Sequence, residues 1–147
     1  MITQGKVNDH FAVVGVIQPQ AITAGATGVL TAAIDMKDFN ALMFVAQSGT
    51  LGTSGTLDVS AVASTTSGGT YTALTGKAAT QLVKATDDNK IVVVHVTEAD
   101  VAAAGKRYVK FKIVAGTANA TSGGVVIGFN NSGKVADENL SDVLQVL

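Results

Sequence analysis

Strand-sized apolar segments alternate with turns rich in Gly, Ser and Thr along most of this chain. The segments are rich in Val, Ile and Thr, and such β-branched side chains favour a pleated sheet. No helical pattern is long enough to cover a parallel sheet, so the strands must pack on one another. The pattern predicts an all-β fold, either an antiparallel β-sandwich or a jelly-roll-like barrel. The expected strands cover residues 11–17, 29–34, 41–47, 57–63, 71–74, 91–96, 107–114 and 125–129.

Alternation inside these segments predicts which side chains face the core. In residues 57–63, Leu57, Val59 and Ala61 share one face and polar residues occupy the other, as in an antiparallel strand with one face in water. Residues 41–47 are apolar on both faces, which favours a central strand. The side chains expected to point inward are Phe44, Val59, Val93, Val109, Phe111 and Ile127.

One short helix is expected near residues 98–104. Thr97 can cap the free backbone N–H groups, acidic residues follow in the first turn, and Gly105 closes the segment. Pro19 is expected to end the first strand, because its region is prone to form a turn.

The length of 147 residues is that of one domain. Neither an internal repeat nor a linker divides the chain. Residues 1–10 are expected to form an N-terminal arm, residues 11–130 a single β-sandwich domain, and residues 131–147 a C-terminal tail.

Composition excludes several classes of function. The chain has no cysteine, which excludes disulfides, thiol catalysis and cysteine-rich zinc sites. Its net charge is −1 and only 14% of its residues are charged, so no electrostatic attraction to nucleic acid or to an anionic membrane is expected. The N-terminus has no apolar core of the signal-peptide kind, and apolar segments such as Ile91 to Val96 are too short to span a membrane.

Few residues could carry acid–base or metal chemistry. The two histidines are His10, in the arm, and His95, which alternates with Val93 on a strand where a neighbour is expected to satisfy its ring. No serine lies in a nucleophile-elbow pattern, and the acidic pairs lack the spacing of a calcium-binding loop. We therefore expect no enzymatic activity, no catalytic or cofactor-binding residues and no bound metal.

Two further motifs have structural interpretations. The pairs Gly68-Gly69 and Gly123-Gly124 lack the strand–loop–helix context that cradles a phosphate, so they are interpreted as turns. The basic residues within 106–112 alternate with apolar ones, which is typical of a strand with a solvated or protein-contacting face.

Three segments resemble the capsid decoration, or cement, proteins of tailed bacteriophages. They are the acidic turn and apolar strand at residues 35–45, the helix-to-strand step at residues 104–110, and the late strand at residues 124–129. The similarity covers roughly residues 10–130 as a pattern, and the C-terminal segment has no counterpart in it.

The resemblance implies a non-enzymatic structural protein of the virion, made in the host cytoplasm and bound to the outside of the capsid. Its partner would be the major capsid protein, whose subunit contacts it would stabilise against internal DNA pressure. It would also bind itself, with a homotrimer favoured and a dimer as the second choice. Neither nucleic acid nor membrane is an expected partner.

Other classes of function stay open. A phage tail or baseplate subunit would have the same composition. A carbohydrate- or receptor-binding sandwich would display Trp or Tyr platforms, whereas this chain has no Trp and only Tyr71 and Tyr108. An ordinary β domain with a core of small residues is the plainest interpretation.

The C-terminal tail is the expected partner interface, because its end is apolar although the rest is polar. As a helix it would present one apolar face, and as a strand it could join the sheet edge of a neighbour. It could also fold back on its own domain. The residues expected at the interface are Leu140, Val143, Leu144, Val146 and Leu147.

Overall fold

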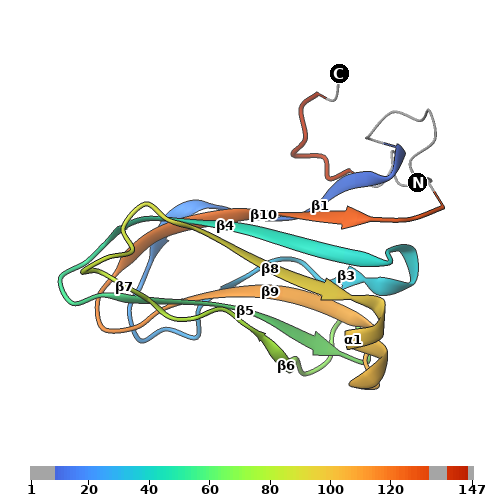
Figure 1. Cartoon of the computed structure of the whole chain (residues 1–147), viewed down its shortest axis with the longest axis horizontal. Helices are drawn as coiled ribbons and strands as arrows, with labels where there is room; N and C mark the ends of the chain where they lie inside the picture. The colour runs from blue at the N-terminus through green and yellow to red at the C-terminus, as the bar shows by residue number, and fades with distance from the viewer. Residues whose placement is uncertain (1–8, 133–138, 146–147) are drawn as a thin grey trace.

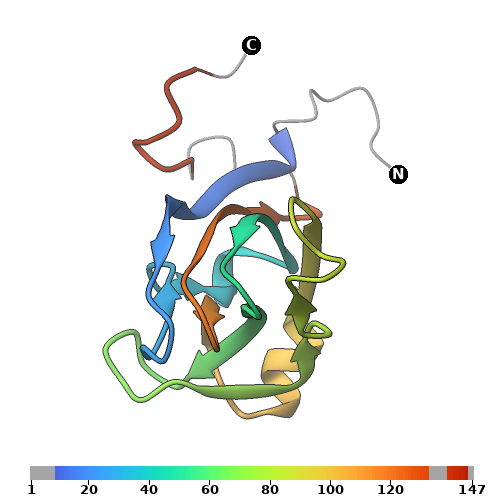
Figure 2. The ribbon, with the colours of Figure 1, turned by 90° about the vertical axis from the view of Figure 1, so that its left-hand side faces the viewer.

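The computed structural model describes residues 9–132 and 139–145, which form a β-sandwich of two antiparallel sheets (Figure 1). The predicted all-β class with one short α-helix is confirmed. Figure 2 views the sandwich from one end, where the two sheets enclose the core. Sheet A has the order β1 (Phe11–Ile22), β10 (Ala120–Phe129), β4 (Ala41–Leu51), β8 (Ile91–Thr97). Sheet B has the order β2 (Val29–Leu30), β9 (Tyr108–Ala115), β5 (Thr56–Ser64), β6 (Thr72–Ala78), with β3 (Ile34–Asp35) also on β9 and β7 (Leu82–Val83) also on β5.

The core lies between the sheets and is centred on two phenylalanines. Phe44 of β4 and Phe111 of β9 are fully buried, and their ring centroids are 5.0 Å apart. Val59 and Val109 belong to the same buried cluster, as predicted. On β9, Lys110 lies between buried neighbours and turns to the outside, which confirms the alternation expected for this strand.

The inward orientation predicted for Val93 and Ile127 is wrong. On β8, Val94 and Val96 face the core, whereas Val93 is 55% exposed. On β10, Val126 is fully buried and Ile127 points to the opposite face. Neither strand has a charged residue on either face, so a period of two residues separates the faces without showing which one is inside.

β1 continues through Pro19 to Ile22, so the prediction that Pro19 ends the first strand is wrong. β1 is an edge strand, where the N–H that proline lacks is not needed for the ladder, and its pairing with β10 is irregular around this residue. The turn predicted at Gly123 and Gly124 is also wrong, because both lie inside β10. A Cβ on Gly123 would lie 2.8 Å from the Ile17 oxygen, so glycine permits the close approach of β1.

The single strand expected over residues 29–34 is divided into β2 and β3, both paired with β9. Thr31 lies between them and is 3% exposed. Its N–H donates to the Phe111 oxygen at 3.0 Å, and its Oγ1 accepts from the Phe111 N–H at 3.1 Å. The side chain therefore satisfies the β9 backbone where the neighbouring strand is interrupted.

The expected short helix is present as α1 (Glu98–Ala103), and a 3-10 turn, η2 (Met36–Asp38), precedes β4. Thr97 caps α1 reciprocally: its Oγ1 accepts from the Asp100 N–H at 3.3 Å, and the Asp100 carboxylate accepts from the Thr97 N–H at 2.8 Å. Asp100 also pairs with Lys77 of β6 at 2.8 Å. Hydrogen bonds from Lys77 and Thr97 lower the pKa of Asp100 to about 2.

Candidate binding surface

The outer face of sheet A, which points away from sheet B, is apolar. None of its four strands contains Asp, Glu, Lys or Arg. Side chains alternate along a strand, so the residues between the buried ones point outward. Ile91 is 62% exposed, and Met43 and Val125 are 38% and 39% exposed. We define the apolar face as Phe11, Val13, Val16, Ala41, Met43, Val45, Ile91, Val93, His95, Val125, Ile127 and Phe129.

Strand pairing arranges the apolar face in rows that cross all four strands. With a strand spacing of ~4.8 Å and a rise of ~3.3 Å over about seven residues, the face covers roughly 450 Å². A contiguous exposed apolar surface of several hundred Å² marks an interaction site on many proteins. The two central rows are Val16–Val125–Val45–Val93 and Val13–Ile127–Met43–His95.

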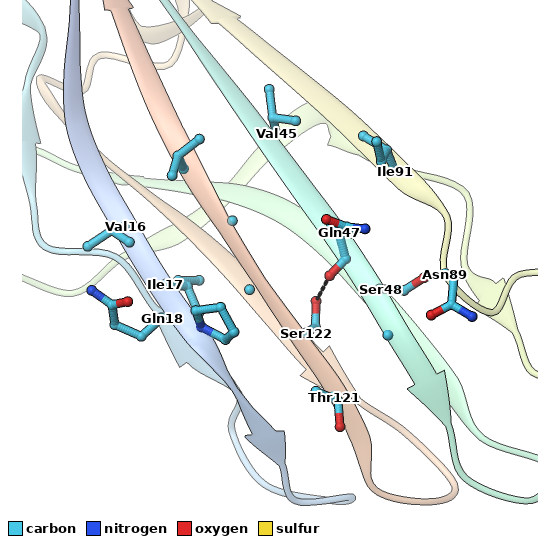
Figure 3. Close-up of a pocket in the computed structure, with 15 residues that line it drawn as sticks. Val16, Ile17, Gln18, Val45, Gln47, Ser48, Asn89, Ile91, Thr121 and Ser122 are labelled. Carbon is cyan, nitrogen blue, oxygen red and sulfur yellow. Dashed lines mark hydrogen bonds between the residues drawn. The ribbon is translucent and has the colours of Figure 1, made fainter. Parts of the chain in front are cut away.

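A groove of about 460 Å³ crosses one end of the apolar face (Figure 3). Gly123 and Gly124 lie in its floor, because β10 has no side chains there. Val16, Val45 and Ile91 come from three other strands and line it with apolar groups. Its polar side chains are Gln18, Gln47, Ser48, Asn89, Thr121 and Ser122.

The two serines of this groove form hydrogen bonds to backbone groups of other segments. The Ser122 hydroxyl donates to the Gln47 backbone oxygen at 2.8 Å, as the dashed line in Figure 3 shows. The Ser48 hydroxyl donates to the Asp87 oxygen and accepts from the Lys90 N–H, both at 2.9 Å. Both serine hydroxyls are buried and bonded to the backbone, so they serve the structure of the groove.

A second depression of about 290 Å³ lies at the other end of the apolar face. Phe11 and Phe129, from adjacent strands, line it with ring centroids 5.1 Å apart. Ala41, Leu42, Met43, His95 and Ile127 complete the lining. The lining is almost wholly apolar, so this end also favours contact with apolar side chains.

The described part of the C-terminal tail lies against the free edge of β1. The Val13 N–H donates to Asn139 Oδ1 at 2.8 Å, and the Leu140 N–H donates to the Val13 oxygen at 2.9 Å. Gln18 also donates to the carboxylate of Asp142 at 3.0 Å. These contacts satisfy the edge strand at Val13, and residues 139–145 form a turn rather than a helix or a strand.

The predicted interface residues of the tail differ in exposure. Leu140 and Val143 are half-buried, whereas Leu144 is 99% exposed. Val146 and Leu147 lie outside the described residues. Figures 1 and 2 both place residues 139–145 beyond β1, on the side of sheet A that faces away from sheet B. The described part of the tail and the apolar face are therefore on the same side of the molecule.

The outer face of sheet B is polar and charged. Lys110 lies over the ring of Tyr71, with Nζ 4.4 Å from its centroid. Arg107 makes two hydrogen bonds to the Asp35 carboxylate, at 2.7 and 2.9 Å, and these lower the pKa of that carboxyl. Asp58 accepts from Gln81 at 3.0 Å. The basic segment therefore has a polar outer face, and its solvated or protein-contacting role stays a prediction.

The titratable residues singled out in the sequence do not come together. His10 Nδ1 lies 3.2 Å from the Asn130 oxygen at the start of β1. His95 is exposed on the apolar face and has no hydrogen-bond partner among the described residues, contrary to expectation. Within residues 9–132 and 139–145, no group of three or more His, Asp or Glu side chains could hold a metal ion. None of the helices in these ranges is long and apolar enough to cross a membrane.

The apolar face was missed at the sequence level. Its signal is present in the apolar residues on both faces of segments 41–47, 91–96 and 125–129. In residues 41–47 this signal predicts a central strand, which is confirmed, because β4 lies between β10 and β8. It does not show that one apolar face is exposed, since each sheet of a two-layer sandwich has only one inner face.

No family model matches this chain, and no curated protein matches it. The similar solved structures include a protein of Bacillus endospore appendages, described as disulfide-linked pili, with 14% identity over 88% of this chain and 98% of that one and a TM-score of 0.38. Another is the infectious bursal disease virus subviral particle, with 11% identity over 86% of this chain and 34% of that one and a TM-score of 0.43. A third is the C-terminal family 22 carbohydrate-binding module from Clostridium thermocellum, with 12% identity over 87% and 98% of the two chains and a TM-score of 0.41. At these identities and TM-scores, the similarities assign no function to this chain.

Proposed function

We propose that this protein is a non-enzymatic structural subunit of a phage virion, which binds the outside of the capsid and stabilises contacts between major capsid subunits. The observation that carries the proposal is the apolar face of sheet A, because it is a broad surface without charge and is exposed to water. Such a surface is stabilised when another protein covers it. The sequence resemblance to capsid decoration proteins is the reason for proposing a phage capsid as the assembly.

In this proposal the tail provides the contact with the capsid. Asn139, Leu140 and Asp142 fix it to β1, so Leu144 is held at the surface and not on a long free chain. Ordering a contact residue in advance reduces the entropy cost of binding. We assign Leu140, Val143, Leu144, Val146 and Leu147 to the contact with the capsid.

A carbohydrate-binding function is the second candidate, and one observation favours it: the groove of about 460 Å³ has several polar side chains. However, none of the described residues that line this groove is aromatic. Sugar sites commonly use an aromatic ring as a stacking platform. A phage tail or baseplate subunit would use the same apolar face and differ in its partner.

Copy number in purified particles tests the proposal directly. Quantitative mass spectrometry of intact virions should find hundreds of copies per particle, as expected for a capsid protein. A few copies per particle would support a tail subunit or a receptor binder instead. Absence from particles that carry the major capsid protein would contradict the proposal.

The contribution of the tail can be tested with matched variants. Deleting residues 134–147 should leave the domain folded and abolish attachment to the particle. Leu144→Asp should weaken attachment strongly, because it places a charge in an apolar contact. Ser141→Asp, at an exposed position of the same turn, is the control and should attach normally. If the truncated domain unfolds, the tail belongs to the core, and normal attachment of the Leu144→Asp variant would contradict the tail assignment.

A further inference from the structure

We propose that the apolar face is the contact surface between two copies of this chain, packed with sheet A against sheet A about a two-fold axis. This inference rests on the proposed function, since it names the partner of one surface of the same structural subunit. The capsid would then be contacted elsewhere, with the tail as the assigned element.

Charge favours a second copy as the occupant. The four strands of sheet A contain no Asp, Glu, Lys or Arg, so placing this face on itself brings no like charges together. A partner chosen by opposite charge would find nothing to pair with here. By contrast, Lys112 and Asp58 lie on the outer side of sheet B, where self-packing would remove charges from water.

The shape of the face also fits another sheet. Its central rows are formed mainly by valine, the side-chain type that also lines the inside of this sandwich. Two sheets with such faces pack about 10 Å apart with interdigitating side chains. A pair would therefore repeat, between copies, the contact that each copy already makes between its own sheets.

The available area predicts a reversible pair. The face supplies roughly 450 Å² per copy, below the ~800 Å² per partner of a standard stable interface. We expect monomer and dimer to exchange at micromolar concentrations.

A two-fold pair also limits growth. In an isologous contact each copy uses the same surface once, so the assembly closes at two. The trimer implied by the resemblance would instead need two different surfaces on every copy. No second apolar surface of comparable size is present among the residues that the structure describes.

Sedimentation velocity of the full chain over the micromolar range tests this inference. The wild type should shift from monomer to dimer with concentration. Val125→Glu places a carboxylate in the centre of the face and should raise the dissociation constant about 100-fold or more, because the charge is buried without a partner. Lys112→Glu, on the outer face of sheet B, is the matched control and should dimerise like the wild type.

Several outcomes overturn the pairing. A wild type that stays monomeric at high micromolar concentration would contradict it, as would a trimer or a dimer unchanged by Val125→Glu. If that variant fails to fold, as judged by circular dichroism, Val93→Lys replaces it, because Val93 is 55% exposed in the monomer. Copy number on purified particles distinguishes the dimer proposal from the proposed function. If a variant that stays monomeric still attaches to the particle, the proposed function is unaffected. Dimers that are absent from particles would overturn the proposed function alone.

Discussion

Sheets A and B each turn one side to the shared core, yet their outer sides have different chemistry. On β9 of sheet B, Lys110 and Lys112 separate the buried residues and keep that face solvated. On β8 of sheet A, the corresponding outward positions are Ile91, Val93 and His95. The fold itself requires only the inner residues to be apolar, so the outer residues of sheet A have another cause. We assign that cause to assembly.

The edges of sheet A differ in a related way. β1 contains Pro19, is irregular in its pairing, and is contacted by the tail at Val13, which are devices that hinder pairing with another chain. β8 has none of these features, although Gly76 to Ala79 of the β6 region lie beside it. Association is therefore expected through the face of the sheet rather than by addition of a strand to β1.

The largest effect is expected where both sheets meet. Phe111→Ala should lower the free energy of unfolding by about 3–5 kcal/mol, because Phe111 is fully buried against Phe44. Lys110→Ala, the neighbouring outward position, should cost less than about 1 kcal/mol. Urea denaturation of both variants gives the comparison. A loss below about 1 kcal/mol for Phe111→Ala would show that the two faces of β9 have been exchanged.

The close approach of β1 to β10 should give the next effect. Gly123→Ala would place a Cβ 2.8 Å from the oxygen of Ile17 and the nitrogen of Pro19, and should destabilise the fold by about 1–3 kcal/mol. Gly68→Ala is the control, because a Cβ there meets no atom within 4 Å. Equal melting temperatures for the two variants would contradict the close packing of β1 against Gly123.

A smaller difference separates the two faces of β8. Val94→Ala should cost about 1–2 kcal/mol in the monomer, because Val94 is 5% exposed. Val93→Ala should cost clearly less, because this residue is 55% exposed. The measurement is chemical denaturation at a concentration low enough to keep the chain monomeric. A larger loss of stability for Val93→Ala than for Val94→Ala would show that Val93 faces the core, as the sequence pattern predicts.

The smallest effect concerns α1, the helix that connects β8 of sheet A to β9 of sheet B. The pKa of Asp100 is lowered from 3.8 to about 2, so its contribution to stability is present above about pH 4 and is lost as the pH falls through 2. Because the pair with Lys77 is partly exposed, we expect only about 1 kcal/mol. Asp100→Asn should remove this part of the acid dependence. An unchanged pH profile of unfolding in the variant would contradict the assignment.

Much of the fold follows from the sequence where a strand is amphipathic. Val59 and Phe111 were placed inside correctly because polar residues mark the opposite face of their strands. The cap at Thr97 was also predictable, because the acid three residues later completes a local motif. These signals are local and need no knowledge of the partner sheet.

The candidate site could not be predicted in the same way. Val93 and Ile127 lie on strands without charged residues to mark the outside, so their faces depend on which side the second sheet covers. The strand through Pro19 and the Gly123 contact depend on tertiary pairing between β1 and β10. The position of the tail depends on Val13, more than a hundred residues away in the chain.

The central claim is that the outer face of sheet A is covered in the assembled protein and that of sheet B is not. The chain has no cysteine, so single substitutions report on one position at a time. Val45→Cys lies in the centre of the apolar face, and Ser60→Cys lies on the central strand β5 of sheet B. We predict that assembly slows alkylation of the V45C thiol strongly and leaves that of the S60C thiol unchanged. Equal alkylation of the V45C thiol in dilute monomer and in assembled protein would contradict the claim.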